Sequence, residues 1–121
     1  MNKQILIVDD EQDILTALKT FYEHYDLDVM TENNCKYCIK YLEQGFIVIL
    51  LIDIMMPGMD GWDTIKEIVR RGYASNVSIK IITGRGSKDH KKIEAFAPYI
   101  SDYISKPFDM DILLSIVKQA S

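Results

Sequence analysis

The feature that most constrains the fold is a run of apolar residues that ends in a carboxylate. Every residue from Phe46 to Ile52 is apolar, and Asp53 follows directly. A run of this length suits one strand, whereas a helix that crosses a bilayer needs about 20 apolar residues. A strand without polar alternation is buried on both faces, as in the centre of a parallel sheet. The run therefore predicts a parallel sheet with helices on both faces.

Strand and helix patterns alternate along the rest of the chain. Further strands are predicted at Ile5–Val8, at Leu27–Thr31, at Ser78–Thr83 and near Tyr103-Ile104. Each strand is followed by apolar residues at helical spacing, which makes five βα units. This order predicts an α/β domain of three layers, built on a doubly wound, five-stranded parallel sheet of flavodoxin-like type.

Polar and glycine residues predict where several helices begin and end. Asn33 and Asn34 predict a turn and a cap for the second helix, and Gly45 is expected to end it. Asp60 is expected to cap the third helix, and Asp109 to cap the last one.

Composition excludes several classes of protein. The chain has 121 residues, the length of one domain, and its apolar fraction of 48% is that of a soluble globular protein. Its net charge is −4 with lysines and arginines spread along the chain, so no nucleic-acid-binding face is indicated. Neither a membrane-spanning run nor a signal peptide is apparent, and we expect a cytoplasmic protein.

Cys35 and Cys38 form a C-x-x-C spacing that could indicate a redox or zinc site. A zinc site needs two further ligands, and the only histidines, His24 and His90, lack ligand spacing. We therefore expect the two cysteines one turn apart on a helix, with Cys38 as a small core residue.

The carboxyl ends of the predicted strands carry polar residues of complementary chemistry. The first strand ends at Asp9 and Asp10, the third at Asp53, the fourth at Thr83 and the last at Lys106. Parallel strands place these ends along one edge of the sheet, where open α/β sheets bind their ligands. We therefore expect three carboxylates, a hydroxyl and an ammonium in one site.

Such a site suits the transfer of a phosphoryl group. Clustered carboxylates repel one another, and Mg²⁺ is their natural partner because it prefers hard oxygen ligands. An aspartate that faces Mg²⁺ and the Lys106 ammonium can attack phosphorus. The Thr83 hydroxyl can donate a hydrogen bond to a phosphoryl oxygen.

Each residue also has a simpler interpretation when it is taken alone. Asp9 and Asp10 could cap a helix. Thr83 could be an ordinary strand residue, and Lys106 a surface lysine. Asp53 is harder to explain in this way, because a charge at the end of a fully buried strand is unusual unless it is functional.

Four stretches of the chain resemble the receiver domain of two-component response regulators, of the chemotaxis-regulator type. They cover essentially the whole chain, and the loop after Asp53 is highly specific to that family. The resemblance implies one receiver domain over residues 1–121, with no output domain in this chain. The stretches are Ile7-Val8-Asp9-Asp10-Glu11, Leu51-Ile52-Asp53-Ile54-Met55-Met56-Pro57-Gly58-Met59-Asp60-Gly61, Ile81-Ile82-Thr83-Gly84 and Tyr103-Ile104-Ser105-Lys106-Pro107-Phe108.

The resemblance implies a role for each site residue. Asp53 accepts phosphate from a phosphohistidine on a sensor histidine kinase or a phosphotransfer protein. Asp10, Asp53 and the backbone carbonyl of Met55 bind Mg²⁺, and Asp9 acts mainly through water.

It also implies a conformational switch. Thr83 and Tyr103 are the switching pair, and Lys106 bridges to the phosphoryl oxygens with a cis bond to Pro107. A downstream target protein docks on the face formed by the fourth helix, the fifth strand and the fifth helix. Such a domain is a phosphoacceptor with slow autodephosphorylation, not a turnover enzyme.

The chain departs from the family pattern in two places. Met55 and Arg85 occupy variable positions that influence the lifetime of the aspartyl phosphate, and Met55 has no polar group to orient water. We therefore expect slow autodephosphorylation. The segment Ala97–Asp102 replaces a run of small residues. We expect a different end to the fourth helix, where Tyr99 could compete with the switch residue Tyr103 for nearby space.

Other functions remain open at this stage. A receiver-like interaction module that works without phosphorylation is one alternative, although the full set of polar strand ends argues against it. An aspartyl-phosphate phosphohydrolase is less favoured, because its nucleophile usually lies in an Asp-x-Asp motif after the first strand. A nucleotide-binding function lacks a G-x-G-x-x-G or P-loop motif.

Overall fold

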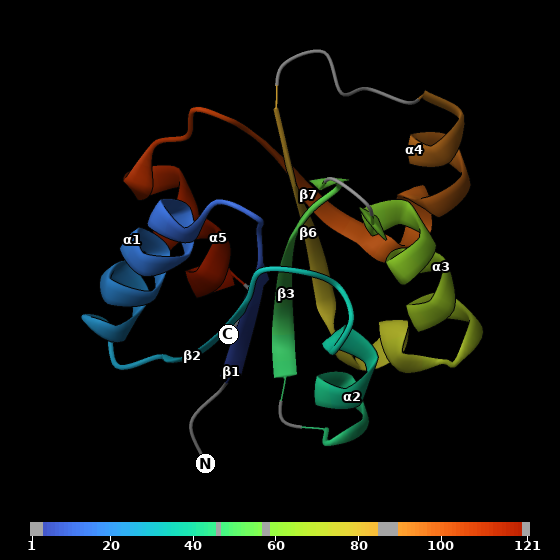
Figure 1. The fold of residues 1–121 in the computed structure, drawn as a ribbon, viewed down its shortest axis with the longest axis horizontal. Coiled ribbons are helices and arrows are strands. Elements are labelled where there is room, and N and C mark those ends of the chain that lie inside the picture. The colour runs from blue at the N-terminus through green and yellow to red at the C-terminus, as the bar shows by residue number, and fades with distance from the viewer. Residues whose placement is uncertain (1–3, 46, 57–58, 85–89, 120–121) are drawn as a thin grey trace.

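A five-stranded parallel sheet forms the centre of the computed structural model, which describes residues 4–45, 47–56, 59–84 and 90–119 (Figure 1). The strand order is β2-β1-β3-β6-β7, and every pairing in this sheet is parallel. The fold class predicted from the sequence is confirmed. The strands are β1 (Gln4–Val8), β2 (Asp28–Glu32), β3 (Ile47–Asp53), β6 (Ser78–Thr83) and β7 (Ile100–Ser105).

Helices cover both faces of the sheet and complete three layers (Figure 1). One face carries α1 (Gln12–Glu23) and α5 (Met110–Gln119), and the other carries α2 (Cys38–Glu43), α3 (Gly61–Arg70) and α4 (His90–Phe96). Within the described ranges, no helix has the length and the hydropathy that a membrane span requires.

The central strand β3 contributes to the core on both faces. Leu50 and Ile52 belong to the cluster under α2 and α3, whereas Ile49 and Leu51 belong to the cluster under α1 and α5. All four side chains are at most 1% exposed. The prediction of a doubly buried strand is confirmed, and Phe46 lies outside the described residues.

The segment after β3 differs from the predicted loop. It contains a short antiparallel hairpin, in which β4 (Met55–Met56) pairs with β5 (Met59–Asp60). α3 begins at the next residue, Gly61. The side chain of Asp60 lies outside the described part of the chain, so its predicted cap stays a prediction.

The start of α2 corrects two predictions. Asn34 forms the expected turn, with its Oδ1 accepting a hydrogen bond from the Lys36 N–H at 2.8 Å. It does not cap the helix, because α2 begins four residues later and the cap position, Tyr37, makes no side-chain cap bond. Cys35 therefore lies in the turn before α2, not on the helix as expected, and its carbonyl accepts from the Cys38 N–H at 3.2 Å.

Both cysteines are buried, and the interpretation of Cys38 as a core residue is confirmed. A hydrogen bond with Cys35, followed by burial, raises the pKa of the Cys38 thiol. A protonated, buried thiol is a poor nucleophile, so this pair contributes packing.

Two helix ends follow the sequence prediction. Gly45 follows Gln44, the C-cap residue of α2, and has a φ of 80°, a conformation that favours glycine. Asp109 caps α5, since its Oδ1 accepts a hydrogen bond from the Asp111 N–H at 2.8 Å.

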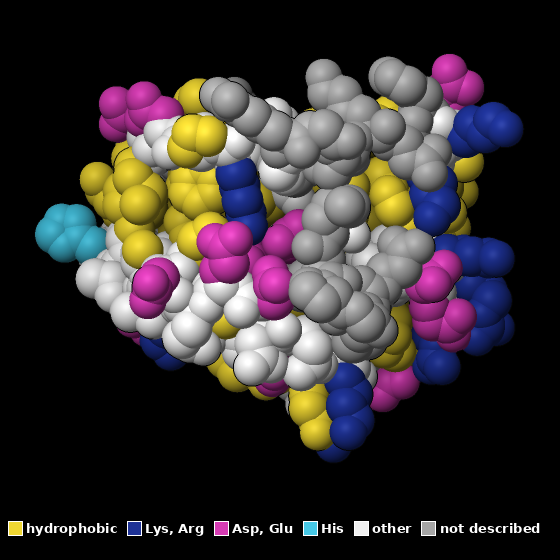
Figure 2. Space-filling view, turned by 45° about the horizontal axis from the view of Figure 1, so that its top comes forward, with side chains coloured by type: hydrophobic (Ala, Val, Ile, Leu, Met, Phe, Trp, Pro, Cys, Tyr) yellow, Lys and Arg dark blue, Asp and Glu magenta, His cyan; other side chains and the backbone are white. Residues whose placement is uncertain are grey.

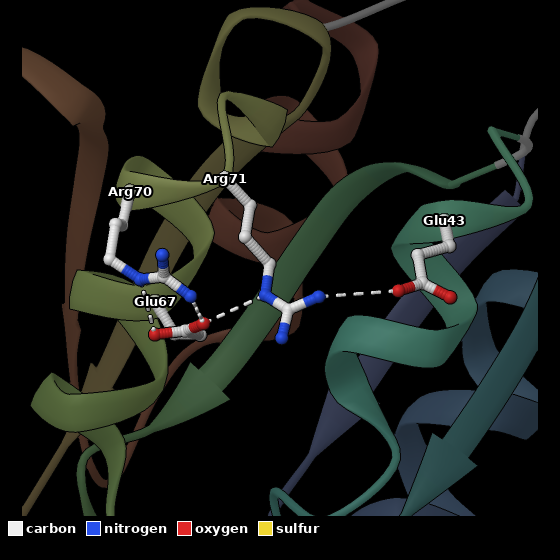
Figure 3. Close-up of polar contacts among 4 residues, drawn as sticks. All are labelled: Glu43, Glu67, Arg70 and Arg71. Atoms are coloured by element: carbon white, nitrogen blue, oxygen red, sulfur yellow. Dashed lines mark hydrogen bonds and ion pairs between the residues drawn. The ribbon is translucent and has the colours of Figure 1, made fainter.

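An exposed ion-pair network joins α2 to α3 (Figure 3). Arg71, the residue directly after α3, pairs with Glu67 of α3 at 2.7 Å and reaches Glu43 of α2 at 3.4 Å. Arg70 also pairs with Glu67. Hydrogen bonds from these two arginines lower the pKa of Glu67 to about 2. Because the network is open to solvent, salt weakens it.

A second ion pair lies inside the sheet, between β6 and β7. The Lys80 side chain is 3% exposed, and its Nζ lies 2.6 Å from Asp102 Oδ2 and 3.0 Å from Ser101 Oγ. The register between the two strands shifts at this point, so that Ile79 faces Ile100 but Lys80 faces Asp102. The sequence alone did not indicate this buried lysine.

Two apolar side chains of α4 pack against the core among the described residues. Ile93 and Phe96 pack against the core, whereas Lys91, Glu94 and Ala95 are exposed. The Phe96 ring stacks on Trp62 of α3, with the ring centroids 5.8 Å apart.

Candidate functional site

Three carboxylates meet at the carboxyl edge of the sheet. Asp9 follows β1, and Asp53 ends β3, the neighbouring strand. Oxygen atoms of Asp9, Asp10 and Asp53 lie within 4.8 Å of one another. Figure 2 shows this edge turned forward, with acidic side chains gathered beside a basic one left of the centre. The sheet therefore brings together the three aspartates that the sequence predicted.

Asp9 is fully buried at the base of this group, whereas Asp10 is exposed. The Asp9 Oδ1 accepts a hydrogen bond from the Glu11 N–H at 2.9 Å. Its Oδ2 accepts no hydrogen bond among the described residues. Glu11 occupies the cap position of α1, so Asp9 does not have the capping role that was its simpler interpretation.

Lys106 supplies the positive charge of the site. Its Nζ lies 2.8 Å from Asp9 Oδ2, an ionic contact without hydrogen-bond alignment, and donates a hydrogen bond to Asp53 Oδ2 at 3.2 Å. Burial alone would lower the pKa of the ammonium, but its contacts with the negative charges of Asp9 and Asp53 outweigh burial and raise the pKa. Lys106 is therefore charged at neutral pH. The Lys106–Pro107 peptide bond is cis, as predicted.

Gly61 fixes the backbone next to Asp53. A Cβ atom at Gly61 would lie 2.7 Å from the Cα of Ile54 and 3.0 Å from the carbonyl oxygen of Asp53. Only glycine allows the first turn of α3 to approach the end of β3 so closely. α3 therefore begins in close contact with the residue that follows β3.

The residues present fit a hard divalent cation. All the ligand atoms that converge are carboxylate oxygens, the donors that Mg²⁺ prefers. The buried Asp9 Oδ2 accepts no aligned hydrogen bond among the described residues and contacts the Lys106 ammonium, so it retains capacity to accept from a further ligand. Among the described side chains of the site, one lysine offsets only part of the charge of three aspartates, so a cation is electrostatically favoured.

Some predicted site residues are described in part. Thr83 ends β6 in register with Ser105, but its side chain and that of Met55 lie outside the described residues, as does all of Arg85. Tyr103 is 43% exposed on β7. Gly84 has open space where a Cβ would lie, consistent with room beside Thr83.

As expected, α4 does not end at a glycine residue before β7. A 3₁₀ turn, Ala97–Tyr99, follows α4 directly and leads into β7. Tyr99 is 42% exposed, like Tyr103.

Sequence reasoning assigned no role to two residues at the site. Glu11 lies with its Oε1 3.9 Å from Lys106 Nζ. Gly61 provides the close approach described above. The direct succession of Glu11 after two site aspartates is a signal that could have identified it.

Comparison with known proteins adds an independent observation. The sequence profile of the family described as "Response regulator receiver domain" matches residues 5–118. The response regulator SaeR of Staphylococcus aureus is 36% identical over 104 residues, which are 86% of this chain and 44% of SaeR. The chain thus spans less than half the length of this curated relative.

Solved structures agree with the fold. A CheY-like response regulator receiver domain protein from Methanospirillum hungatei has a TM-score of 0.83 at 36% identity, over 93% of this chain and 89% of that one. A response regulator receiver protein from Pseudomonas putida has a TM-score of 0.86 over 98% of both chains, and at 24% identity it shows the fold alone.

Proposed function

This chain belongs to the family of response regulator receiver domains, and we propose that it accepts a phosphoryl group on Asp53 from a sensor histidine kinase or a phosphotransfer protein. One observation carries the proposal. The Asp53 side chain is 5% exposed, lies in a group of three aspartates and accepts a hydrogen bond from Lys106 at 3.2 Å. A buried carboxylate with a cation on one side is suited to attack an electron-poor phosphorus atom.

The chemical step is a transfer between two side chains. An oxygen of Asp53 forms a bond to phosphorus while the bond from phosphorus to the donor imidazole nitrogen breaks. The electron pair of that bond returns to the imidazole. The Lys106 ammonium is placed to stabilise the charge that spreads over the phosphoryl oxygens.

We assign Mg²⁺ to the same site. Asp10, Asp53 and the backbone carbonyl of Met55 would hold it, and Asp9 would act through water. Bound Mg²⁺ would neutralise phosphoryl oxygens and align the incoming group. The support is the all-oxygen donor set and the remaining acceptor capacity of the buried Asp9 Oδ2.

The conformational response belongs to the same proposal. A phosphoryl group adds about −1.5 to −2 charge and new acceptor oxygens at Asp53. Thr83 and Lys106 gain contacts only in that state, so they bias a two-state equilibrium that also involves Tyr103. The surface of α4, β7 and α5 then presents the change to a downstream partner.

The test is phosphorylation by acetyl phosphate with Mg²⁺, followed by mass spectrometry of the intact chain. We expect the parent to gain the mass of one phosphoryl group and the Asp53→Asn variant to gain none. Trp62 follows the hairpin after Asp53, so its fluorescence provides a second readout. An unmodified parent with unchanged fluorescence would refute the proposal.

The same experiment separates the switch from an enzyme. A phosphoacceptor captures one phosphoryl group per chain and releases it slowly, whereas a phosphohydrolase releases many equivalents of phosphate. We therefore expect capture to stop at one equivalent. Continuous release of phosphate from the donor would instead favour the hydrolase.

A further inference from the structure

Glu11 places a fourth carboxylate at the mouth of the site. Its backbone position is fixed, because its N–H donates to the buried Asp9 Oδ1 at 2.9 Å and its φ and ψ of −89° and 107° are extended. Its side chain is 60% exposed, and its Oε1 lies 3.9 Å from Lys106 Nζ. Glu11 thus lies on the solvent side of the ammonium, with Asp9 and Asp53 on the protein side.

This carboxylate acts through charge and not through a hydrogen bond. A separation of 3.9 Å is beyond hydrogen-bond range, and the Lys106 ammonium already contacts Asp9 and Asp53 at shorter distances. An exposed ion pair of this length stabilises the fold little. Its effect on the potential at the entrance is not cancelled, because a charge acts on an approaching anion at longer range than a hydrogen bond.

The charge balance of the described side chains shows how Glu11 changes the net charge of the site. Three aspartates and Glu11 carry four negative charges against one positive charge on Lys106, which leaves a net −3. A divalent cation reduces this to −1. Without the Glu11 charge, the same loaded site would be neutral toward an incoming donor.

We propose that Glu11 is a specificity-determining residue that disfavours free, doubly charged phosphodonors relative to donors of lower charge. A phosphohistidine carries its phosphoryl group on an imidazole within a protein and can offset the charge with its own surroundings. A small phosphate anhydride in solution has no such compensation. This inference rests on the proposed function of Asp53 as the phosphoacceptor.

Two small phosphodonors of different net charge isolate the effect of donor charge on the rate of phosphorylation. Acetyl phosphate is doubly charged near neutral pH, and its transfer to Asp53 releases acetate. Phosphoramidate is singly charged because its nitrogen is protonated, and its transfer releases ammonia. Both reactions form the same bond between Asp53 and phosphorus, so the ratio of their rates reports the charge of the donor.

The experiment measures both rates by intact mass spectrometry for the parent, Glu11→Gln and Asp13→Asn. Glutamine keeps the side-chain size and the backbone contact to Asp9. Asp13 is the matched control, since it is an exposed acid in the first turn of α1 and loses the same charge. Mg²⁺ affinity is determined first by calorimetry, and each variant is then assayed at saturating Mg²⁺.

We expect Glu11→Gln to raise the ratio of the acetyl phosphate rate to the phosphoramidate rate about threefold at low ionic strength, the effect of one unit charge about 7 Å away in water. The increase should largely vanish near 1 M salt, where the screening length is about 3 Å. Asp13→Asn should leave the ratio unchanged.

The outcomes are separable. An unchanged ratio in Glu11→Gln, or an equal change in Asp13→Asn, overturns the role of Glu11 while phosphorylation of Asp53 stands. A ratio that rises but does not respond to salt also overturns it, since the effect is then steric. If neither donor modifies the parent, the proposed function itself fails and the role of Glu11 fails with it.

Discussion

Replacing Gly61 with alanine tests how the chain holds the proposed phosphoacceptor Asp53 in place. The added Cβ would lie 2.7 Å from the Cα of Ile54 and 3.0 Å from the Asp53 carbonyl oxygen. Carbon atoms in contact prefer about 3.5–4.0 Å, so the backbone of one segment must move. Both atoms in the way belong to backbone and not to a flexible side chain, which leaves little room for relaxation.

The magnitude follows from two opposing effects. Overpacking of this kind destabilises a fold by about 1–3 kcal/mol. Alanine favours a helix interior over glycine by about 1 kcal/mol, but Gly61 is the first residue of α3, where that gain is smaller. We expect a net loss of about 1–2 kcal/mol, which lowers the midpoint of urea unfolding by about 1 M.

The assay is urea unfolding of Gly61→Ala beside Gly84→Ala. Gly84 is a matched control near the same edge of the sheet, because a Cβ there meets nothing within 4 Å. The Gly61 variant should also accept phosphate more slowly under folded conditions, since the clash displaces the Asp53 carbonyl. Equal unfolding midpoints for the two variants would refute the steric reasoning.

Four further predictions follow from other contacts. Asp102→Ala should destabilise the fold by about 3 kcal/mol and Lys80→Met by less than about 1.5 kcal/mol in chemical unfolding, because only the first leaves a buried charge unpaired. The pKa of Glu67, about 2, lies below the ordinary 4.5, so its stabilisation is present above pH 4.5 and lost as the pH falls toward 2. An NMR titration of its carboxyl carbon checks this midpoint, which should rise in high salt. Mg²⁺ at about 100 times its dissociation constant should stabilise the parent by about 2.7 kcal/mol in thermal unfolding, and Asp10→Asn should lose most of this gain. Met55→Asn should release phosphate faster than the parent, because an amide can orient water, and an unchanged rate of phosphate release would contradict this role.

The sequence predicted those parts of the fold that depend on burial over a whole element. The run Phe46–Ile52 indicated a strand covered on both faces, and β3 is one. The convergence of Asp9, Asp10, Asp53 and Lys106 followed from the parallel topology alone.

The parts that were missed depend on contacts between segments distant in sequence. Lys80 lies in a strand of otherwise mostly apolar residues, and only the paired strand shows that Asp102 lies opposite it. Gly61 has no local feature that reveals Ile54 beside it. The cap of α2 was placed too early because Asn34 forms a turn of its own, a use of asparagine that competes with capping.

The position of β3 has a consequence for the dynamics of the domain. This strand has a hydrogen-bonded neighbour on each side, whereas β7 is an edge strand. Amide hydrogens of β3 should therefore exchange with solvent only through global unfolding, and those of the edge strand β7 through local opening. The proposed phosphoacceptor is thus expected to lie in a more persistent cooperative unit than β7, the strand that carries the proposed switch residue Tyr103.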